Sequence, residues 1–243
     1  MTKSAANRDR PARKMPKSKE AFLDAATRLF AAHGYDGMTI RDVAKEAGAT
    51  LGTLHYHWGN KDGLVRDICA LQLQPLVDAR LARYAALDEF NRTHPGNKER
   101  IAALLRAHFD PFIDIFGGSD AERSLMQQFY IRVSSDPAPA VRAISNEIMT
   151  EMSREFVRRL HNLCDHLPRQ EFHWRLNAVL GTTLHLQAFS TRLSNLAQRL
   201  DLASGDEDYM AIRNAITPTV HFLVEALVAP PCDGDEAAKE PSG

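Results

Sequence analysis

The chain has 243 residues, of which 44% are hydrophobic and 25% are charged, a composition typical of a soluble globular protein with one large or two smaller domains. The longest uncharged stretch, residues 176–191, is shorter than the ~20 apolar residues that span a bilayer, and no apolar signal segment follows the basic N-terminus. Three widely spaced cysteines argue against a disulfide framework, so we expect a cytoplasmic protein.

The net charge of −1 hides an asymmetry between the two ends of the chain. Residues 1–18 are strongly basic and are expected to form a disordered arm, whereas residues 231–243 are expected to form an acidic, disordered tail. A polyanionic partner should therefore approach the N-terminal part of the protein.

Apolar residues recur at helical spacing along nearly the whole chain, and no β-hairpin turn sequence interrupts them. The sequence therefore predicts an all-α fold of about nine helices. The first helix is expected over residues 19–33, with Gly34 and Gly37 at its end. Its apolar face consists of Phe22, Ala26, Leu29 and Phe30.

The next three helices begin at clear capping residues. Thr39 caps the second helix, Thr50 caps the third, and a glycine ends each of them. Asn60 caps a longer fourth helix, which Pro75 is expected to kink or divide because proline lacks a backbone N–H and clashes with the preceding turn. The later helices are expected over residues 98–116, 120–133, 138–166, 170–200 and 207–229.

Residues 39–61 have the pattern of a helix-turn-helix motif, in which two short helices meet at a glycine. Ala44 and Leu54 are the expected packing pair between these helices. The other face of the second helix carries hydroxyl and planar groups suited to phosphates and base edges, and a glycine that lets the backbone approach the duplex. These residues are Thr50, Gly52, Thr53, His55, Tyr56 and His57.

This block resembles the TetR (tetracycline-repressor-like) family of bacterial transcriptional regulators. The matching positions include Ala26, Leu29, Phe30, Gly34, Tyr35, Thr39, Ile40, Val43, Ala44, Gly48, Gly52, Leu54, Tyr56, His57, Lys61 and Leu64. The resemblance implies a helix-turn-helix DNA-binding domain over residues 19–68 and a helical ligand-binding and dimerisation domain over residues 69–230. It also implies that Thr39 and Lys61 hold phosphates at helix N-termini and that the recognition helix faces DNA. Leu51 is expected to contact a thymine methyl group or nothing.

The resemblance further implies that the last two helices form a four-helix bundle with a second subunit. The residues expected at this dimer interface are Leu180, Gly181, Leu184, Phe222 and Leu223. Glycine inside a helix costs ~1 kcal/mol relative to alanine, which a close crossing of two helices at Gly181 would offset. The alternative is that both helices are buried within one subunit.

A pocket for a small, apolar effector is expected among the middle helices, where aromatic residues and methionines recur at helical spacing. The candidate lining residues are Phe109, Phe112, Phe116, Phe129, Tyr130, Met152, Phe156, Trp174 and His185. The same pattern also fits an ordinary helical core, so both interpretations remain open.

We predict no catalytic residues, no metal site and no cofactor, because His161, Cys164 and His166 do not share one helix face and no second cluster completes a tetrahedral site. The expected function is a homodimeric regulator, a repressor that a small apolar effector releases from a palindromic operator in double-stranded DNA. The alternatives are a helical small-molecule-binding or scaffold protein that has lost DNA recognition, or a thiol enzyme using Cys164.

Overall fold

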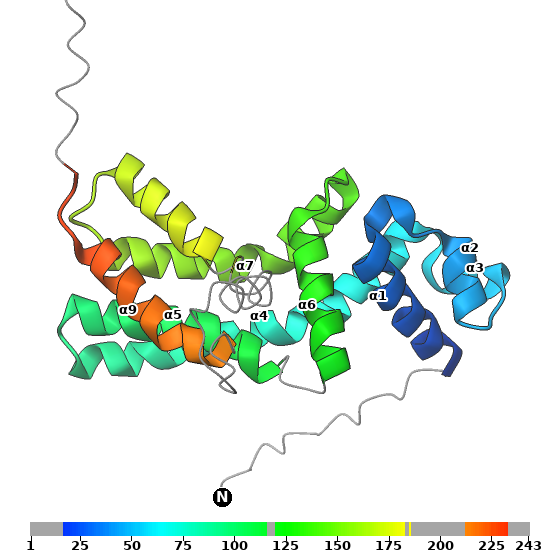
Figure 1. The fold of residues 1–243 in the computed structure, drawn as a ribbon, viewed down its shortest axis with the longest axis horizontal. Helices are drawn as coiled ribbons and strands as arrows, with labels where there is room; N and C mark the ends of the chain where they lie inside the picture. The colour runs from blue at the N-terminus through cyan, green and yellow to red at the C-terminus, as the bar shows by residue number, and fades with distance from the viewer. Residues whose placement is uncertain (1–16, 116–119, 183–184, 186–211, 233–243) are drawn as a thin grey trace, which may run out of the picture.

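The computed structural model describes residues 17–115, 120–182, 185 and 212–232 (Figure 1). Every regular element within these ranges is a helix, which confirms the predicted all-α fold. None of the described helices is both long and apolar enough to cross a bilayer. The predicted arm up to residue 16 and the predicted tail from residue 233 lie outside the described residues.

Helices α1 (Lys17–Gly37), α2 (Ile40–Glu46) and α3 (Leu51–Trp58) form a head at one end of the molecule (Figure 1). All three predicted N-caps are confirmed, because the side chains of Thr39, Thr50 and Asn60 each accept a backbone N–H from the first turn of their helix. The predicted packing pair of Ala44 and Leu54 is buried in one core. The helix-turn-helix motif therefore has the expected local structure.

Helix α4 (Lys61–Thr93) is a single helix of 33 residues that runs from the head into the rest of the protein. The expected division at Pro75 is wrong. Pro75 is exposed and so is Leu71, whose carbonyl loses its helical N–H partner, so water can satisfy that carbonyl and the helix continues. The predicted domain boundary after residue 68 falls inside this helix.

The body consists of α5 (Asn97–Ile115), α6 (Asp120–Ser135), α7 (Pro139–Leu163), a helix over residues 169–182 and α9 (Ile212–Val228). In Figure 1, α6 stands beside the head, whereas α5, α9 and the helix over residues 169–182 gather at the opposite end. Residues 186–200 of the predicted penultimate helix lie outside the described residues.

The described side chains form two hydrophobic cores. The first core joins α1, α2, α3 and the first half of α4 to α6 and the start of α7. The second core joins the second half of α4 to α5, the remainder of α7, the helix over residues 169–182 and α9. Because α6 belongs to the first core, the head packs directly on the body.

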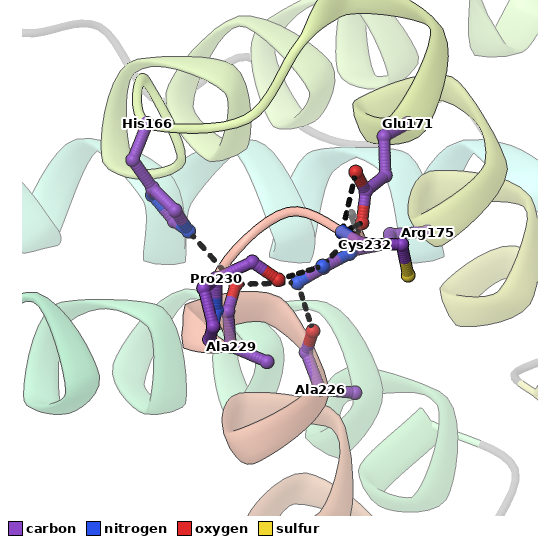
Figure 2. Close-up of polar contacts among 7 residues, drawn as sticks. All are labelled: His166, Glu171, Arg175, Ala226, Ala229, Pro230 and Cys232. Atoms are coloured by element: carbon purple, nitrogen blue, oxygen red, sulfur yellow. Dashed lines mark hydrogen bonds and ion pairs between the residues drawn. The ribbon is translucent and has the colours of Figure 1, made fainter. Parts of the chain in front are cut away.

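A side-chain clamp fixes the end of α9 against the helix over residues 169–182 (Figure 2). The Arg175 guanidinium donates to the carbonyls of Ala226 at 2.6 Å, Ala229 at 2.8 Å and Pro230 at 2.7 Å, and it also pairs with Glu171. The last carbonyls of a helix lack helical partners and favour a cation, so Arg175 both satisfies and neutralises the end of α9.

The joint between head and body depends on Gly34, near the end of α1. Gly34 has φ 70° and ψ −173°, a conformation open essentially only to glycine. A Cβ atom at this position would lie 2.8 Å from Oδ2 of Asp136, and the next residue, Tyr35, donates its backbone N–H to that same oxygen at 2.9 Å. Asp136 is 6% exposed and caps the turn into α7 by accepting the N–H of Ala138.

We expect Gly34→Ala to lower the free energy of unfolding by about 2 kcal/mol or more, because it combines a strained φ with a clash against the Asp136 carboxylate. Urea unfolding followed by circular dichroism measures this change. Gly52→Ala is the matched control, since its Cβ would meet only Thr50 Oγ1 at 3.8 Å. The control should be neutral or stabilising by up to ~1 kcal/mol. Equal effects of the two substitutions would contradict this account of the joint.

Candidate DNA interface

Helix α3 is anchored to the head along one face. Leu54 is fully buried, and the indole of Trp58 packs edge-on against Phe22 with ring centroids 5.6 Å apart. Trp58 is only partly buried, because its Nε1 donates to Asp67 of α4 at 2.9 Å. These contacts hold α3 against α1 and α4, so its other face is presented to solvent in a fixed orientation.

The outer face of α3 carries the residues predicted to contact DNA. Tyr56 is 86% exposed and Leu51 is 36% exposed. Thr50, Gly52 and His55 are also exposed, whereas Thr53 and His57 are partly buried. The tyrosine ring lies edge-on to the ring of His57, 5.3 Å between centroids. The structure therefore brings these residues together on one accessible surface.

The two predicted phosphate-binding threonines already serve the helices that they begin. Thr50 Oγ1 accepts the backbone N–H of Thr53 at 3.3 Å. Thr39 Oγ1 accepts the N–H of Asp42 at 3.1 Å and donates its proton to the Asp42 carboxylate at 2.6 Å. A phosphate at the start of α2 must therefore compete with Asp42 for the Thr39 hydroxyl.

His55 has one ring nitrogen committed and one available. Its Nδ1 lies 2.8 Å from the carbonyl oxygen of Gly59, which ends α3. Because a carbonyl oxygen only accepts, Nδ1 carries the proton and the neutral ring keeps Nε2 as an acceptor. Protonation of His55 adds an N–H donor at Nε2 without breaking the bond to Gly59.

Lys61 lies at the N-terminus of α4, and its position is set by an aromatic ring. Its Nζ is 4.1 Å from the centroid of the Tyr35 ring, within the range of a cation–π contact. The Tyr35 hydroxyl donates to Asp62, and this hydrogen bond raises the pKa of Tyr35 to about 12. Lys61 is thus held at a helix end that favours anions and beside the residue that joins head to body.

Two basic residues of α2 were not singled out from the sequence. Arg41 and Lys45 are both exposed and lie one turn apart, opposite the buried Val43 and Ala44. The four-residue spacing of two cations on the polar face of a helix-turn-helix motif was the signal available in the sequence.

The predicted pocket residues are divided between the two cores. Phe112, Phe129 and Tyr130 are buried in the first core, and Phe109, Met152 and Phe156 are buried in the second. His185 is exposed, and Phe116 lies outside the described residues. Trp174 is 64% exposed and lines an open groove of about 740 Å³, together with Val157, His161, Arg169, Gln170, Phe172, His173 and Leu176.

The predicted dimer residues have different environments. Phe222 is 69% exposed and Leu180 is 42% exposed. Gly181 is exposed, and a Cβ there would meet no atom within 4 Å. Leu223, in contrast, is only 2% exposed and contributes to the second core of its own subunit. Leu184 lies outside the described residues.

Comparison with known families accounts for both parts of this architecture. Residues 22–68 match the family model described as bacterial regulatory proteins, tetR family, and residues 106–226 match the model described as tetracyclin repressor-like, C-terminal domain. The chain belongs to the TetR family. The resemblance inferred from the head is thereby confirmed, and it extends into the body.

Curated TetR-family relatives match the head most strongly. The transcriptional regulator LmrA of Bacillus subtilis is 48% identical over 48 residues, which are 19% of this chain and 26% of that protein. The transcriptional repressor AcnR of Corynebacterium glutamicum is 38% identical over 47 residues, 19% of this chain and 25% of AcnR. The transcriptional regulator BetI of Agrobacterium fabrum is 30% identical over 94 residues, 39% of this chain and 42% of BetI. The chain thus covers from a quarter to less than half of these relatives.

Solved structures share the fold over nearly the whole chain. The fatty acid degradation regulator FadR from Bacillus halodurans matches with a TM-score of 0.54 at 19% identity, covering 89% of this chain and 99% of FadR. A tetR family regulator from Shewanella sp. PV-4 matches with a TM-score of 0.53 at 18% identity, covering 84% and 95%. At these identities the similarity establishes the TetR fold alone.

We expect Lys61→Ala to weaken DNA binding for all sequences alike, because a phosphate contact carries no base information. The slope of log affinity against log salt concentration should become shallower by ~0.9, since the variant neutralises one phosphate fewer. Fluorescence anisotropy with a labelled duplex at several salt concentrations measures this slope. Lys98→Ala removes the same charge at the far end of the body, where Lys98 pairs with Glu225, and should leave the slope unchanged. An unchanged slope for Lys61→Ala would remove Lys61 from the interface.

Proposed function

We propose that the chain is a cytoplasmic, homodimeric repressor that binds a palindromic operator through α3 and is released by a small, largely apolar effector bound in its body. The observation that carries this proposal is the outer face of α3, where exposed donors lie on a helix that Leu54 and Trp58 anchor from behind. A fixed helix with short polar and planar side chains suits the major groove.

The proposed dimer is supported by apolar side chains that one subunit leaves in solvent. Phe222 on α9, together with Trp174 and Leu180 on the helix over residues 169–182, is far more exposed than large apolar side chains usually are. These two helices belong to the second core, away from the head (Figure 1). A two-fold axis at this end would leave both heads free to reach successive turns of DNA.

Coupling between effector and operator would pass through the joint between head and body. Helix α6 packs on α1, Asp136 holds the backbone of Tyr35, and α4 extends through both parts. An effector that binds more tightly to one arrangement of α6 and α7 would shift the population of head spacings. A spacing that no longer matches the DNA repeat would release the operator.

A second candidate function is a small-molecule-binding protein that has lost DNA recognition. The observation that favours it is Leu51, an apolar side chain that is 36% exposed at the start of the recognition helix. This alternative requires that the protein have no measurable affinity for duplex DNA at low salt, where phosphate contacts are strongest.

We expect footprinting on the DNA upstream of its own gene to reveal a palindromic site. The two half-site centres should lie ~34–36 Å apart, or a multiple of that distance, because two recognition helices must enter the same side of the duplex. A single asymmetric half-site would contradict the dimeric proposal, and the absence of any protection at low salt would favour the alternative function.

We expect Gly181→Leu to convert the dimer to a monomer. A Cβ at Gly181 meets no atom of its own subunit, so the larger side chain should clash only with a partner helix. Light scattering measures the mass, and far-ultraviolet circular dichroism should show unchanged helix content. Ala86→Leu, on the exposed side of α4, is the control and should stay dimeric. A Gly181→Leu dimer of unchanged mass would place the interface elsewhere.

A further inference from the structure

Arg80 is a fully buried cation in the middle of the effector-binding body. It lies on α4 and is 1% exposed. Its Nε donates to the carbonyl oxygen of His108 at 2.8 Å, and its Nη1 faces the Met152 sulfur at 3.6 Å, a weak acceptor. Its Nη2 is shielded from solvent and has no hydrogen-bond partner. Most of the donor capacity of this guanidinium is therefore unused.

The carboxylates around Arg80 are committed to other arginines. On α7, Glu155 accepts from both Arg158 and Arg159, and Arg159 also pairs with Asp88 of α4. Arg80 itself forms no ion pair with any of the residues that the structure describes. Because a guanidinium stays protonated, this region contains a buried positive charge without a partner, which is unfavourable unless something else compensates it.

The polar neighbours of Arg80 cannot supply the missing negative charge. Burial and the charge of Arg80 lower the pKa of His108 well below its ordinary value, so its imidazole is neutral. Burial raises the pKa of Tyr84, which therefore remains an uncharged phenol. The Tyr84 hydroxyl and His108 Nδ1 lie 2.6 Å apart and satisfy each other. This buried cluster therefore has a net charge of about +1, contributed by Arg80.

The surroundings of the cluster are apolar and aromatic. The His108 ring lies 4.3 Å from the ring of Phe156 and 5.9 Å, edge-on, from that of Phe109. Met152, whose sulfur faces Arg80, is a flexible side chain that can repack around a guest. Three of the residues predicted to line an effector pocket thus surround one unpaired cation.

We propose that Arg80 binds the carboxylate of an amphipathic monocarboxylic acid whose apolar body lies against Phe109, Met152 and Phe156. The planar fork of a guanidinium matches a carboxylate with two parallel N–H···O bonds. A single carboxylate also balances the single unpaired charge, whereas a phosphate ester brings nearly two negative charges at neutral pH. This inference rests on the proposed function in one respect, that the body binds a small effector.

The test uses the full-length protein with two carboxylates, octanoate and benzoate, and their neutral amides, octanamide and benzamide. At millimolar concentration at least one carboxylate should raise the melting temperature by about 2 °C or more, and its amide should not. The same carboxylate should weaken operator binding. If neither carboxylate shifts the melting temperature, or if acid and amide act equally, the proposal is wrong.

Arg80→Met distinguishes ligand binding from a purely structural role. It removes the unpaired charge and keeps a long apolar side chain, so the variant should melt at or above the wild-type temperature. Its affinity for the carboxylate should fall at least ~10-fold. Arg83→Met is the matched control three residues along α4, where Arg83 pairs with Asp110 and Asp114 at the edge of the body. The control should keep the wild-type response to the carboxylate.

Further outcomes separate this inference from the proposed function. If Arg80→Met does not fold, Arg80→Lys keeps the charge without the planar fork and should still bind the carboxylate several-fold more weakly than wild type. An equal response of wild type and either variant overturns the inference. A protein that responds to the carboxylate but never binds duplex DNA overturns the regulatory function instead. Operator binding without any carboxylate response overturns the inference alone.

Discussion

The packing of α1 against α6 is the contact on which the rest of the architecture depends. It places residues of the head and of the body in one continuous core, so the recognition helix has a defined orientation relative to the body. The Asp136 carboxylate reinforces this joint by binding the backbone of Tyr35, at the point where Gly34 bends the chain. A change in the position of α6 must therefore move α1, and with it α3, because closely packed cores shift between discrete arrangements instead of deforming smoothly.

The two cores differ in a way that fits a division of roles. The first contains closely packed apolar side chains, such as Phe22, Phe30 and Phe129, and stabilises the joint. The second surrounds Arg80 and its neutral neighbours, a polar group that hydrophobic residues of similar volume would replace at lower cost in stability. Retaining an unpaired cation in the body is readily understood if a ligand completes it.

The head shows how capping and recognition share the same atoms. Thr39 and Thr50 order the first turns of α2 and α3, and His55 satisfies the last turn of α3 through Gly59. The surface that faces solvent is therefore held in place before any partner arrives, which reduces the entropy cost of binding. Lys61 is restrained in the same way by the ring of Tyr35.

The sequence by itself determined the features that depend on local interactions: the helical periodicity, the three N-caps and the helix-turn-helix motif, because each involves residues a few positions apart. Only the tertiary structure decided which residues at helical spacing are core and which are surface, since burial depends on contacts between distant segments. It placed Leu223 inside the subunit and left Phe222 in solvent, although the sequence grouped them together. It also revealed that Arg80 is buried without an acidic partner, because the carboxylates that could neutralise it belong to other helices and pair elsewhere.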